Sequence, residues 1–261
     1  MPQRTGISRR RFVQLGGGVA VVGLTGGFAS ADGHDDQSEG DDSMDDGGET
    51  ANVRVAHLSP DAPNVDVFVD DEAVLEDVPF TAVSDYLELP AGSYNVKVSP
   101  AGEGPEGAVL EEDLDVPAAD LTVAAIGEVS GENQPLELAV LEDDNGDPGD
   151  AARVRAVHAS PDAPAVDVVV AETGDALFEG VEFGDAAYAE VPAGDYRLCV
   201  YPAGEREEAV LGADVEAMGG TVASAFAVGY VAPDDAPADE AFEIVLTVDF
   251  EGGDGDDSDD H

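Results

Sequence analysis

The chain of 261 residues carries 59 acidic and only 10 basic residues, which gives a formal net charge of −49. Nucleic-acid-binding proteins are excluded, because they need a basic surface to meet the phosphate backbone. Such a charge opposes compaction in dilute buffer, whereas at molar salt the Debye length falls to about 3 Å and screens most of the repulsion. Because 43% of the residues are hydrophobic, the composition predicts a folded, salt-adapted protein rather than a disordered acidic chain.

The first 31 residues have the order of an export signal: a basic stretch, an apolar Gly-rich stretch and a small-residue cleavage site. The basic stretch resembles the twin-arginine (Tat) export motif, at Ser8, Arg9, Arg10 and Phe12. Ala29 and Ala31 form an A-x-A cleavage site. We therefore expect residues 1–31 to be a signal peptide recognised by the Tat translocase, and the mature protein to be extracellular or at the cell surface. A leader retained as a membrane anchor is the alternative.

The remainder of the chain contains an internal duplication. Residues 53–69 match residues 154–170 at an offset of 101, and the segment around Tyr94 matches the segment around Tyr196 at an offset of 102. The flanking acidic segments lack the apolar residues of a core, so we expect them to be disordered. The expected boundaries are 32–50 for an acidic linker, 51–142 and 152–250 for two domains, 143–151 for the interdomain linker and 251–261 for an acidic tail.

Hydrophobic residues alternate with a period of two inside each copy, as at Val65, Val67 and Val69. Val-rich runs bounded by Pro, Gly and Asp recur about every ten residues, which is typical of an antiparallel β-sandwich. The repeated Pro-Ala-Gly-x-Tyr segment predicts a corner at which the hydroxyl of Tyr94 or Tyr196 bonds back to the turn, as in immunoglobulin-like folds. We therefore expect an all-β protein of two tandem immunoglobulin-like antiparallel β-sandwich domains, with seven or eight strands each.

Both copies pair the motif V-R-x-x-H-x-S-P-D-A-P-x-V-D-V with a later L-P-A-G-x-Y-x-V, although the second copy has Val191 and Leu198 at two positions of the later motif. This pairing resembles the domain of unknown function family 4397. The resemblance implies an exported, β-rich domain of prokaryotic surfaces that often occurs in tandem. It implies no catalytic activity.

The residues of the motif that could carry chemistry are His57, Ser59 and Asp61, with His158, Ser160 and Asp162 in the second copy. A Ser-His-Asp relay needs the histidine between the other two side chains at hydrogen-bonding distance, and three residues within five positions rarely converge in this way. Ser-Pro-Asp-Ala-Pro is instead typical of a rigid turn in which side-chain oxygens satisfy nearby N–H groups. We expect these residues to be structural and the protein not to be an enzyme.

Metal binding has only weak candidates. His57 and His158 lack enough neighbouring ligands for a zinc site, and an EF-hand aligned on Gly146 would begin at Leu141, which cannot coordinate Ca²⁺. The acidic candidates lie in the interdomain segment, at Asp143, Asp144, Asp147 and Asp150. The expectation is no cofactor, with a looser Ca²⁺ site between the domains as the alternative.

Compartment, duplication and missing catalytic chemistry together predict a non-enzymatic interaction or structural protein of a salt-adapted cell. Its expected partner is an extracellular or cell-envelope protein or glycan. Two alternatives stay open: a surface spacer made rigid by Ca²⁺, and an exported metal-dependent hydrolase.

The charge generates a first prediction. Removal of the leader leaves six basic residues against all 59 acidic residues, a net charge of −53. When salt is lowered from the molar to the millimolar range, the unscreened repulsion should abolish the β-sheet signal of the mature protein in circular dichroism. Equal stability at both salt concentrations would contradict the adaptation to high salt.

Overall fold

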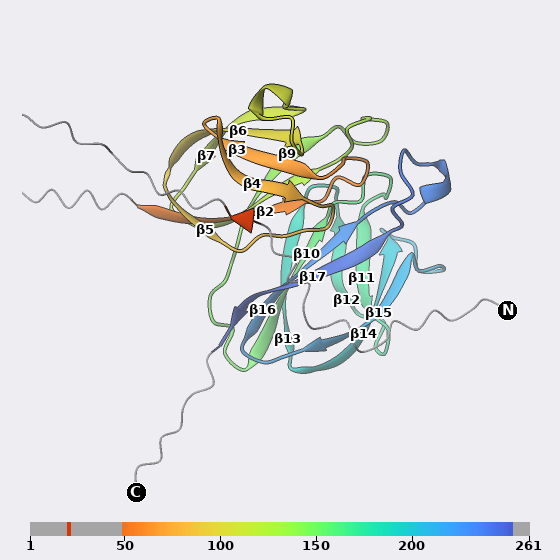
Figure 1. The fold of residues 1–261 in the computed structure, drawn as a ribbon. Coiled ribbons are helices and arrows are strands. Elements are labelled where there is room, and N and C mark those ends of the chain that lie inside the picture. Colours follow the sequence, from red (N-terminus) through yellow and green to blue (C-terminus); the bar gives the residue numbers. More distant parts are fainter. Residues whose placement is uncertain (1–19, 22–48, 253–261) are drawn as a thin grey trace, which may run out of the picture.

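The computed structural model describes residues 20–21 and 49–252. The expected cleavage site, most of the expected signal peptide and acidic linker, and the tail beyond Gly252 lie outside the described residues. The described chain is built of β-strands and two short 3₁₀ turns, η1 (Pro105–Gly107) and η2 (Pro233–Asp235) (Figure 1). Among these residues no helix has the length and hydrophobicity of a membrane span.

The first domain is a sandwich of two sheets. Its strands are β2 (Thr50–His57), β3 (Val65–Val69), β4 (Glu72–Val78), β5 (Leu87–Pro90), β6 (Gly92–Pro100), β7 (Leu110–Val116), β8 (Asp120–Ile126) and β9 (Glu137–Glu142). One sheet has the order β4-β3-β6-β7, with the two-residue β1 (Ala20–Val21) paired to β4, and the other has the order β5-β2-β8-β9. Successive strands cross repeatedly between the two sheets, which closes the sandwich around one core.

The second domain repeats this topology. Its strands are β10 (Ala151–His158), β11 (Val166–Val170), β12 (Ala176–Val181), β13 (Ala186–Pro192), β14 (Gly194–Pro202), β15 (Leu211–Ala217), β16 (Thr221–Val228) and β17 (Glu243–Glu251). Its sheets have the orders β12-β11-β14-β15 and β13-β10-β16-β17. The two tandem β-sandwiches expected from the sequence are confirmed. The pairing is antiparallel except between β2 and β8 and between β10 and β16, which run parallel.

The Pro-Ala-Gly-x-Tyr segment forms the corner predicted from the sequence. Strands β5 and β6 belong to different sheets and are separated only by Ala91, so the chain turns from one sheet into the other at this point. The Tyr94 hydroxyl donates to the carbonyl of Pro90 at 2.7 Å, and the Tyr196 hydroxyl donates to Pro192 at 2.8 Å. Each tyrosine therefore ties its strand back to the end of the preceding sheet.

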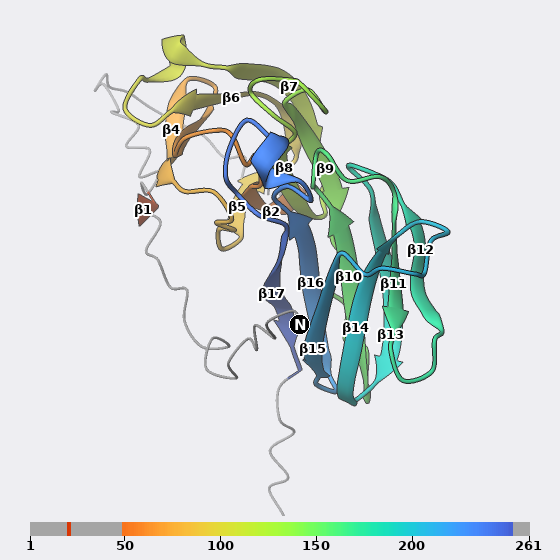
Figure 2. The same ribbon diagram turned by 90° about the vertical axis from the view of Figure 1, so that its right-hand side faces the viewer.

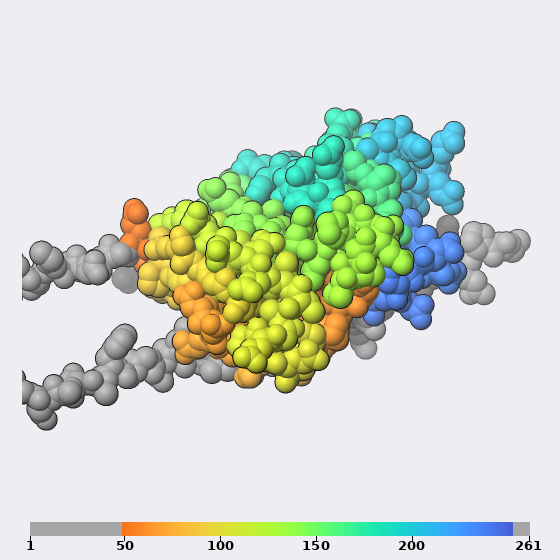
Figure 3. Space-filling model, turned by 90° about the horizontal axis from the view of Figure 1, so that it is seen from above, coloured from red at the N-terminus to blue at the C-terminus, as the bar shows by residue number. Residues whose placement is uncertain are grey.

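The central strands of the sheets β5-β2-β8-β9 and β13-β10-β16-β17 are covered on both faces, whereas the outer strands β9 and β17 keep exposed residues such as Val140 and Leu246. In β2, Val53 and Val55 face the core of their own sandwich, whereas Ala56 packs in a second hydrophobic cluster with Val157 and Phe226 of the other domain. This double burial explains why every residue from Leu121 to Ile126 is buried. The two domains therefore pack against each other through these sheets (Figures 2 and 3).

We predict that Tyr94→Phe and Tyr196→Phe each lower the free energy of unfolding by about 0.5–1.5 kcal/mol, because each removes one intramolecular hydrogen bond at a corner. Chemical denaturation at molar salt measures the change. The double variant should lose the sum of the two changes, since the corners lie in different domains. Unchanged stability in both single variants would show that water replaces the bond at no cost.

Candidate functional site

The histidines of the repeated motif are buried and hold the turn that follows them. His57 and His158 are each 1% exposed. The Nε2 atom of His57 lies 3.1 Å from the carbonyl of Pro63, and that of His158 lies 3.0 Å from the carbonyl of Pro164. A carbonyl only accepts, so Nε2 carries the proton in both rings. Burial lowers the pKa of both histidines, against the opposing effect of these backbone carbonyls.

The aspartates of the Ser-Pro-Asp-Ala-Pro turn bind a distant loop. Asp61 accepts hydrogen bonds from the backbone N–H groups of Val129 and Ser130 at 2.8 and 2.9 Å. Asp162 does the same with Val231 and Ala232, both at 2.9 Å. Each turn is therefore fastened to the loop that follows β8 or β16. The sequence indicated a turn bonded to nearby N–H groups, but the donors lie some 70 positions along the chain.

The serines of the motif are not placed to act as nucleophiles. Ser59 and Ser160 are fully buried, and the Ser160 hydroxyl donates to the carbonyl of Gly229 at 2.6 Å. The Ser160 N–H, not its hydroxyl, is the group that faces Nδ1 of His158, at 3.3 Å. Because the imidazole does not receive the hydroxyl proton and the hydroxyl does not meet solvent, this arrangement cannot perform the Ser-His-Asp reaction.

The second aspartate of the motif organises two more turns. Asp66 is buried in β3 and accepts from the N–H of Asp77 and of Gly102, both at 2.8 Å. Asp167 accepts from Gly180 and Gly204 in the same way, and these bonds lower its pKa although burial acts in the opposite direction. The motif thus supplies buried acceptors for backbone N–H groups that would otherwise lack partners.

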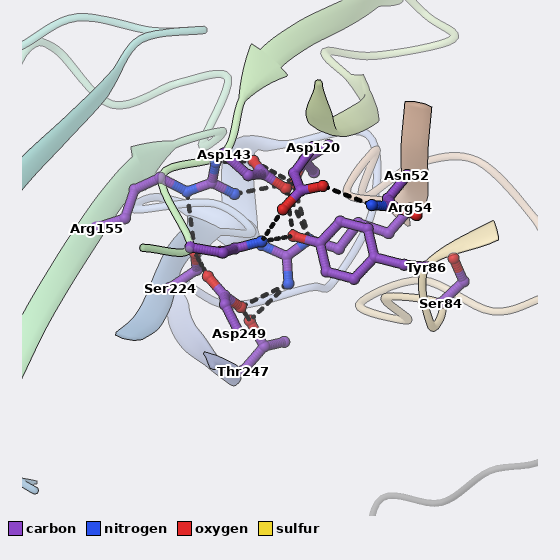
Figure 4. A network of polar contacts seen from close by, with 12 residues as sticks. Asn52, Arg54, Ser84, Tyr86, Asp120, Asp143, Arg155, Ser224, Thr247 and Asp249 are labelled. Atoms are coloured by element: carbon purple, nitrogen blue, oxygen red, sulfur yellow. Dashed lines mark hydrogen bonds and ion pairs between the residues drawn. The ribbon is translucent and has the colours of Figure 1, made fainter. Parts of the chain in front are cut away.

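Two arginines at equivalent positions of the repeat meet between the domains (Figure 4). Arg54 of β2 is 3% exposed and contacts Asp249 of β17 at 2.5 Å. Arg155 of β10 is fully buried and forms an ion pair with Asp143, which follows β9. Each arginine therefore binds a carboxylate of the other domain, and the Nε of Arg54 also lies 3.5 Å from a carboxylate oxygen of Asp143 in its own domain. Two guanidinium groups and two carboxylates leave the buried cluster without net charge.

Hydroxyl groups complete the hydrogen bonding of this cluster. Arg54 donates from Nε to Thr122 at 2.8 Å, and Arg155 donates from Nε to Ser224 at 2.9 Å, each within its own domain. Arg155 also donates from a terminal nitrogen to Thr122 at 2.9 Å, which crosses the interface. Charged groups removed from water need such partners to offset the loss of hydration.

Aromatic rings cover both guanidinium groups. The Cζ of Arg54 lies 5.1 Å from the ring centre of Tyr86, and that of Arg155 lies 5.6 Å from the ring centre of Tyr188. Phe226 lies within 6.0 Å of both guanidinium carbons. Burial lowers the pKa of Arg54, but the hydrogen bond and charge of Asp249 together with the electrostatic effects of Tyr86 and Asp143 outweigh burial and raise that pKa overall. Burial raises the pKa of both Tyr86 and Tyr188, and the carboxylate of Asp143 adds to the effect, so both tyrosine rings stay neutral.

A second contact between the domains joins the starts of the two motif turns, because Leu58 and Ala159, each directly after a motif histidine, pack in one hydrophobic cluster. Tyr230 is fully buried, and burial raises the pKa of its hydroxyl, followed by the effects of the carboxylates of Glu128, Asp61 and Asp162. Glu128 occupies in the first domain the position that Tyr230 occupies in the second, at an offset of 102. Glu128 is itself buried and accepts from the backbone and side chain of Asn133. The carboxylates that face Tyr230 therefore belong to both domains.

The interdomain segment contains one buried residue, although its acidic composition indicates contact with solvent. Asp143 is buried, and both its oxygens accept from Thr122 at 2.7–2.8 Å. Asp144 lies apart on the surface and pairs with Arg153 at 2.8 Å. Asp147 bonds to the N–H of Gly149 within its own turn. Asp143 is held by arginine, which removes it from any calcium site that the other acidic residues could form.

The candidate metal ligands do not assemble. In the described part of the chain, no three His, Cys, Asp or Glu side chains come together as metal ligands would. His57 and His158 lie in different domains, and each directs Nε2 at a backbone carbonyl. Cys199 is a partly buried free thiol.

Sequence reasoning missed the arginine cluster. All six basic residues outside the expected leader form ion pairs, and two of them are the equivalent arginines at the V-R positions of the motif. In a chain with so few cations, an arginine repeated within a predicted strand was the signal that could have indicated a buried ion pair. The sequence could not identify the partner, because Arg54 and Asp249 are separated by 195 positions.

The fold and this interface define a class of protein: an all-β chain of two duplicated sandwiches joined by a buried polar cluster. The chain belongs to the family described as Domain of unknown function (DUF4397), whose model matches residues 51–169 and 152–257. The resemblance noted in the sequence is thereby confirmed. No curated protein matches the chain.

Solved structures show only distant likeness. The Bacillus anthracis TIE protein is 12% identical with a TM-score of 0.23; the match covers 69% of this chain and 34% of that one. This chain therefore corresponds to about a third of that protein. A structure described as a putative cell adhesion protein from Bacteroides eggerthii is 11% identical, with a TM-score of 0.20 and coverage of 79% and 98%. One so described from Parabacteroides distasonis is 12% identical, with a TM-score of 0.17 and coverage of 77% and 96%. Similarity this low carries no functional argument.

We predict that Arg155→Leu lowers the free energy of unfolding by about 3–5 kcal/mol, because it leaves Asp143 charged and buried without its cation. The double variant Arg155→Leu/Asp143→Leu should regain part of the loss. Arg197→Leu is the matched control: Arg197 pairs with Asp214 on the surface, at 52% and 80% side-chain exposure, so its loss should cost about 0–1 kcal/mol. Equal effects of both arginine substitutions would contradict a special role for the buried cluster.

The buried histidines generate a prediction on pH. Their folded-state pKa values lie below 6.5, the value expected for the unfolded chain. Below pH 6.5 the unfolded chain therefore binds more protons than the folded one, and stability falls as pH falls through this range. NMR titration of the imidazole rings should give values below 6.5 for His57 and His158, assigned with His57→Gln and His158→Gln. Values at or above 6.5 would contradict the buried, neutral rings.

Proposed function

We propose that the protein is an exported, non-enzymatic structural and interaction protein of the cell surface, in which two DUF4397 domains act as one rigid body. The observation that carries this proposal is the buried cluster in which Arg54 binds Asp249 and Arg155 binds Asp143. A rigid pair of domains holds a binding surface at a fixed orientation outside the cell. The proposed partner is an extracellular or cell-envelope protein or glycan.

Rigidity follows from the cost of separating the domains. Separation would expose the apolar cluster around Phe226 and Val157, and would leave each arginine without the carboxylate of the other domain. Apolar burial favours the docked state by about 25 cal/mol per Å², and a broken buried ion pair adds a further penalty. Domains move relative to one another unless their interface is large and hydrophobic, and the cluster around Phe226 supplies the hydrophobic part of this interface.

The lack of enzymatic activity is supported by the use of the motif's polar side chains. His57, Asp61 and Asp66 all bond to backbone groups, and so do their counterparts in the second domain. No hydroxyl of the motif is both exposed and activated. A Ca²⁺-rigidified spacer finds less support, because arginine already neutralises Asp143 at the interface.

Export and surface localisation are supported by the twin-arginine motif and by the net charge, which suits a concentrated salt solution. Export and surface localisation are tested separately from the rigidity of the domain pair.

Small-angle X-ray scattering of the mature protein at molar salt tests the rigid body. The wild type should scatter as one compact particle with two packed domains. Arg54→Leu/Arg155→Leu should increase the radius of gyration while circular dichroism still reports β-sheet, whereas Arg197→Leu should leave the profile unchanged. A wild-type profile that requires an ensemble of domain orientations would overturn the proposal.

Fractionation of cells that express the tagged chain tests export. The wild type should be recovered from the cell surface or the medium, and Arg9→Lys/Arg10→Lys should accumulate inside the cell. Thermal melting with Ca²⁺ or Zn²⁺ at constant ionic strength separates the alternatives, because a ligand that binds the folded state raises the melting temperature. A saturable rise with micromolar Ca²⁺ would favour the spacer, and one with Zn²⁺ alone would favour the hydrolase.

A further inference from the structure

The two sandwiches have differently filled interiors. Between its sheets the first domain contains a cavity of about 440 Å³, whereas the corresponding space in the second domain is about 70 Å³. Valine and leucine side chains form most of the walls of the larger cavity, among them Val67, Val74, Val96 and Leu114. The domains share one topology, so the difference arises from the residues that fill and close them.

One cause of the difference is a single core position. Val96 pairs with Val69 across β3 and β6, and Leu198 pairs with Val170, the residue equivalent to Val69, across β11 and β14. Val96 lines the cavity of the first domain, and Leu198 lines the small space of the second domain. The longer leucine side chain thus fills some of the volume that valine leaves free in the first domain.

A second cause lies at the edge of the sandwich. Strand β13 pairs with β10 over seven residues, from Ala151 to Val157, whereas β5 pairs with β2 over only four, from Thr50 to Val53. The Val55 N–H donates to the hydroxyl of Ser84 at 2.9 Å rather than to a strand carbonyl. The second domain has Ala186 at the equivalent position, and its strand continues. The shortened β5 leaves the first sandwich less completely closed along this edge.

The cavity meets solvent among acidic side chains. Its lining includes Asp70, Glu72 and Glu88, all exposed, which lie at the β3–β4 turn and on β5. The rest of the lining is apolar apart from His57 and Tyr94. A ligand with a carboxylate head would meet like charges at this opening, whereas a neutral or cationic head would not.

The volume is in the range of small-molecule pockets. Such pockets measure about 300–1,000 Å³ and are lined mainly by apolar side chains. An engineered apolar cavity of about 150 Å³ already binds benzene, and unfilled apolar space forfeits packing contacts. We propose that the cavity of the first domain binds the hydrocarbon tail of a single-chain amphiphile, whose uncharged or cationic head lies among Asp70, Glu72 and Glu88. This goes beyond the proposed function, since a rigid domain pair needs no cavity.

The test uses the mature protein at molar salt and the neutral apolar fluorophore N-phenyl-1-naphthylamine. Its fluorescence should rise saturably with one site per chain. Decan-1-ol and decylammonium should displace it at concentrations about tenfold lower than decanoate does, because the acidic opening repels a carboxylate. No saturable binding by the wild type would overturn the proposal.

Two variants locate the site, and a third is the control. Val96→Phe, at a residue that lines the cavity, should weaken binding by about tenfold or more by filling the cavity, with circular dichroism confirming the fold. Val140→Phe enlarges an exposed residue of β9 and should bind as the wild type does. Glu88→Lys, on the surface of the opening, should shift the preference toward decanoate. Unchanged binding by Val96→Phe, or an unchanged head-group preference in Glu88→Lys, would overturn the proposed location.

Discussion

The arrangement of the two domains depends on two buried ion pairs that cross the interface. These pairs join Arg54 to Asp249 and Arg155 to Asp143. Each domain alone would expose one arginine and one aspartate on a sheet face, together with the hydroxyl group of Thr122 or Ser224 that binds the arginine. Docking removes all four charges from water, and this is tolerated only because each charge finds an opposite one together with hydroxyl partners. The pairs cross the interface in both directions, so neither is complete until both domains have docked.

This constraint gives the repeated motif a physical meaning. Its arginine enters the interface, its histidine holds the following turn, and its first aspartate fixes that turn to the loop after β8 or β16. The starts of the two turns pack together through Leu58 and Ala159 between the domains. The polar residues that resemble a catalytic set are therefore the residues that assemble one sandwich and dock it on the other. A binding function has to be sought elsewhere on the molecule.

The two domains carry different residues at two kinds of equivalent position. One kind lies at the interface between the domains, and the other lies between the two sheets of each sandwich. The Phe226 ring centre lies within 6.0 Å of both guanidinium carbons, and the equivalent residue of the first domain is the small Ala124. Val96 and Leu198, at equivalent positions, differ in the same manner inside the two sandwiches. The first of these differences permits close docking, and the second leaves more space inside the first domain.

The sequence alone determined the duplication, the all-β class, the period-two strands and the tyrosine corners, because each is encoded within some ten residues of chain. Export and salt adaptation rest on leader pattern and charge and stay predictions. Tertiary structure decided what distant segments do together: it buried Asp143, which composition assigned to a solvated linker, and paired Arg54 with Asp249. It also decided that the first core is hollow. These outcomes depend on contacts between residues up to 195 positions apart, which no local pattern records.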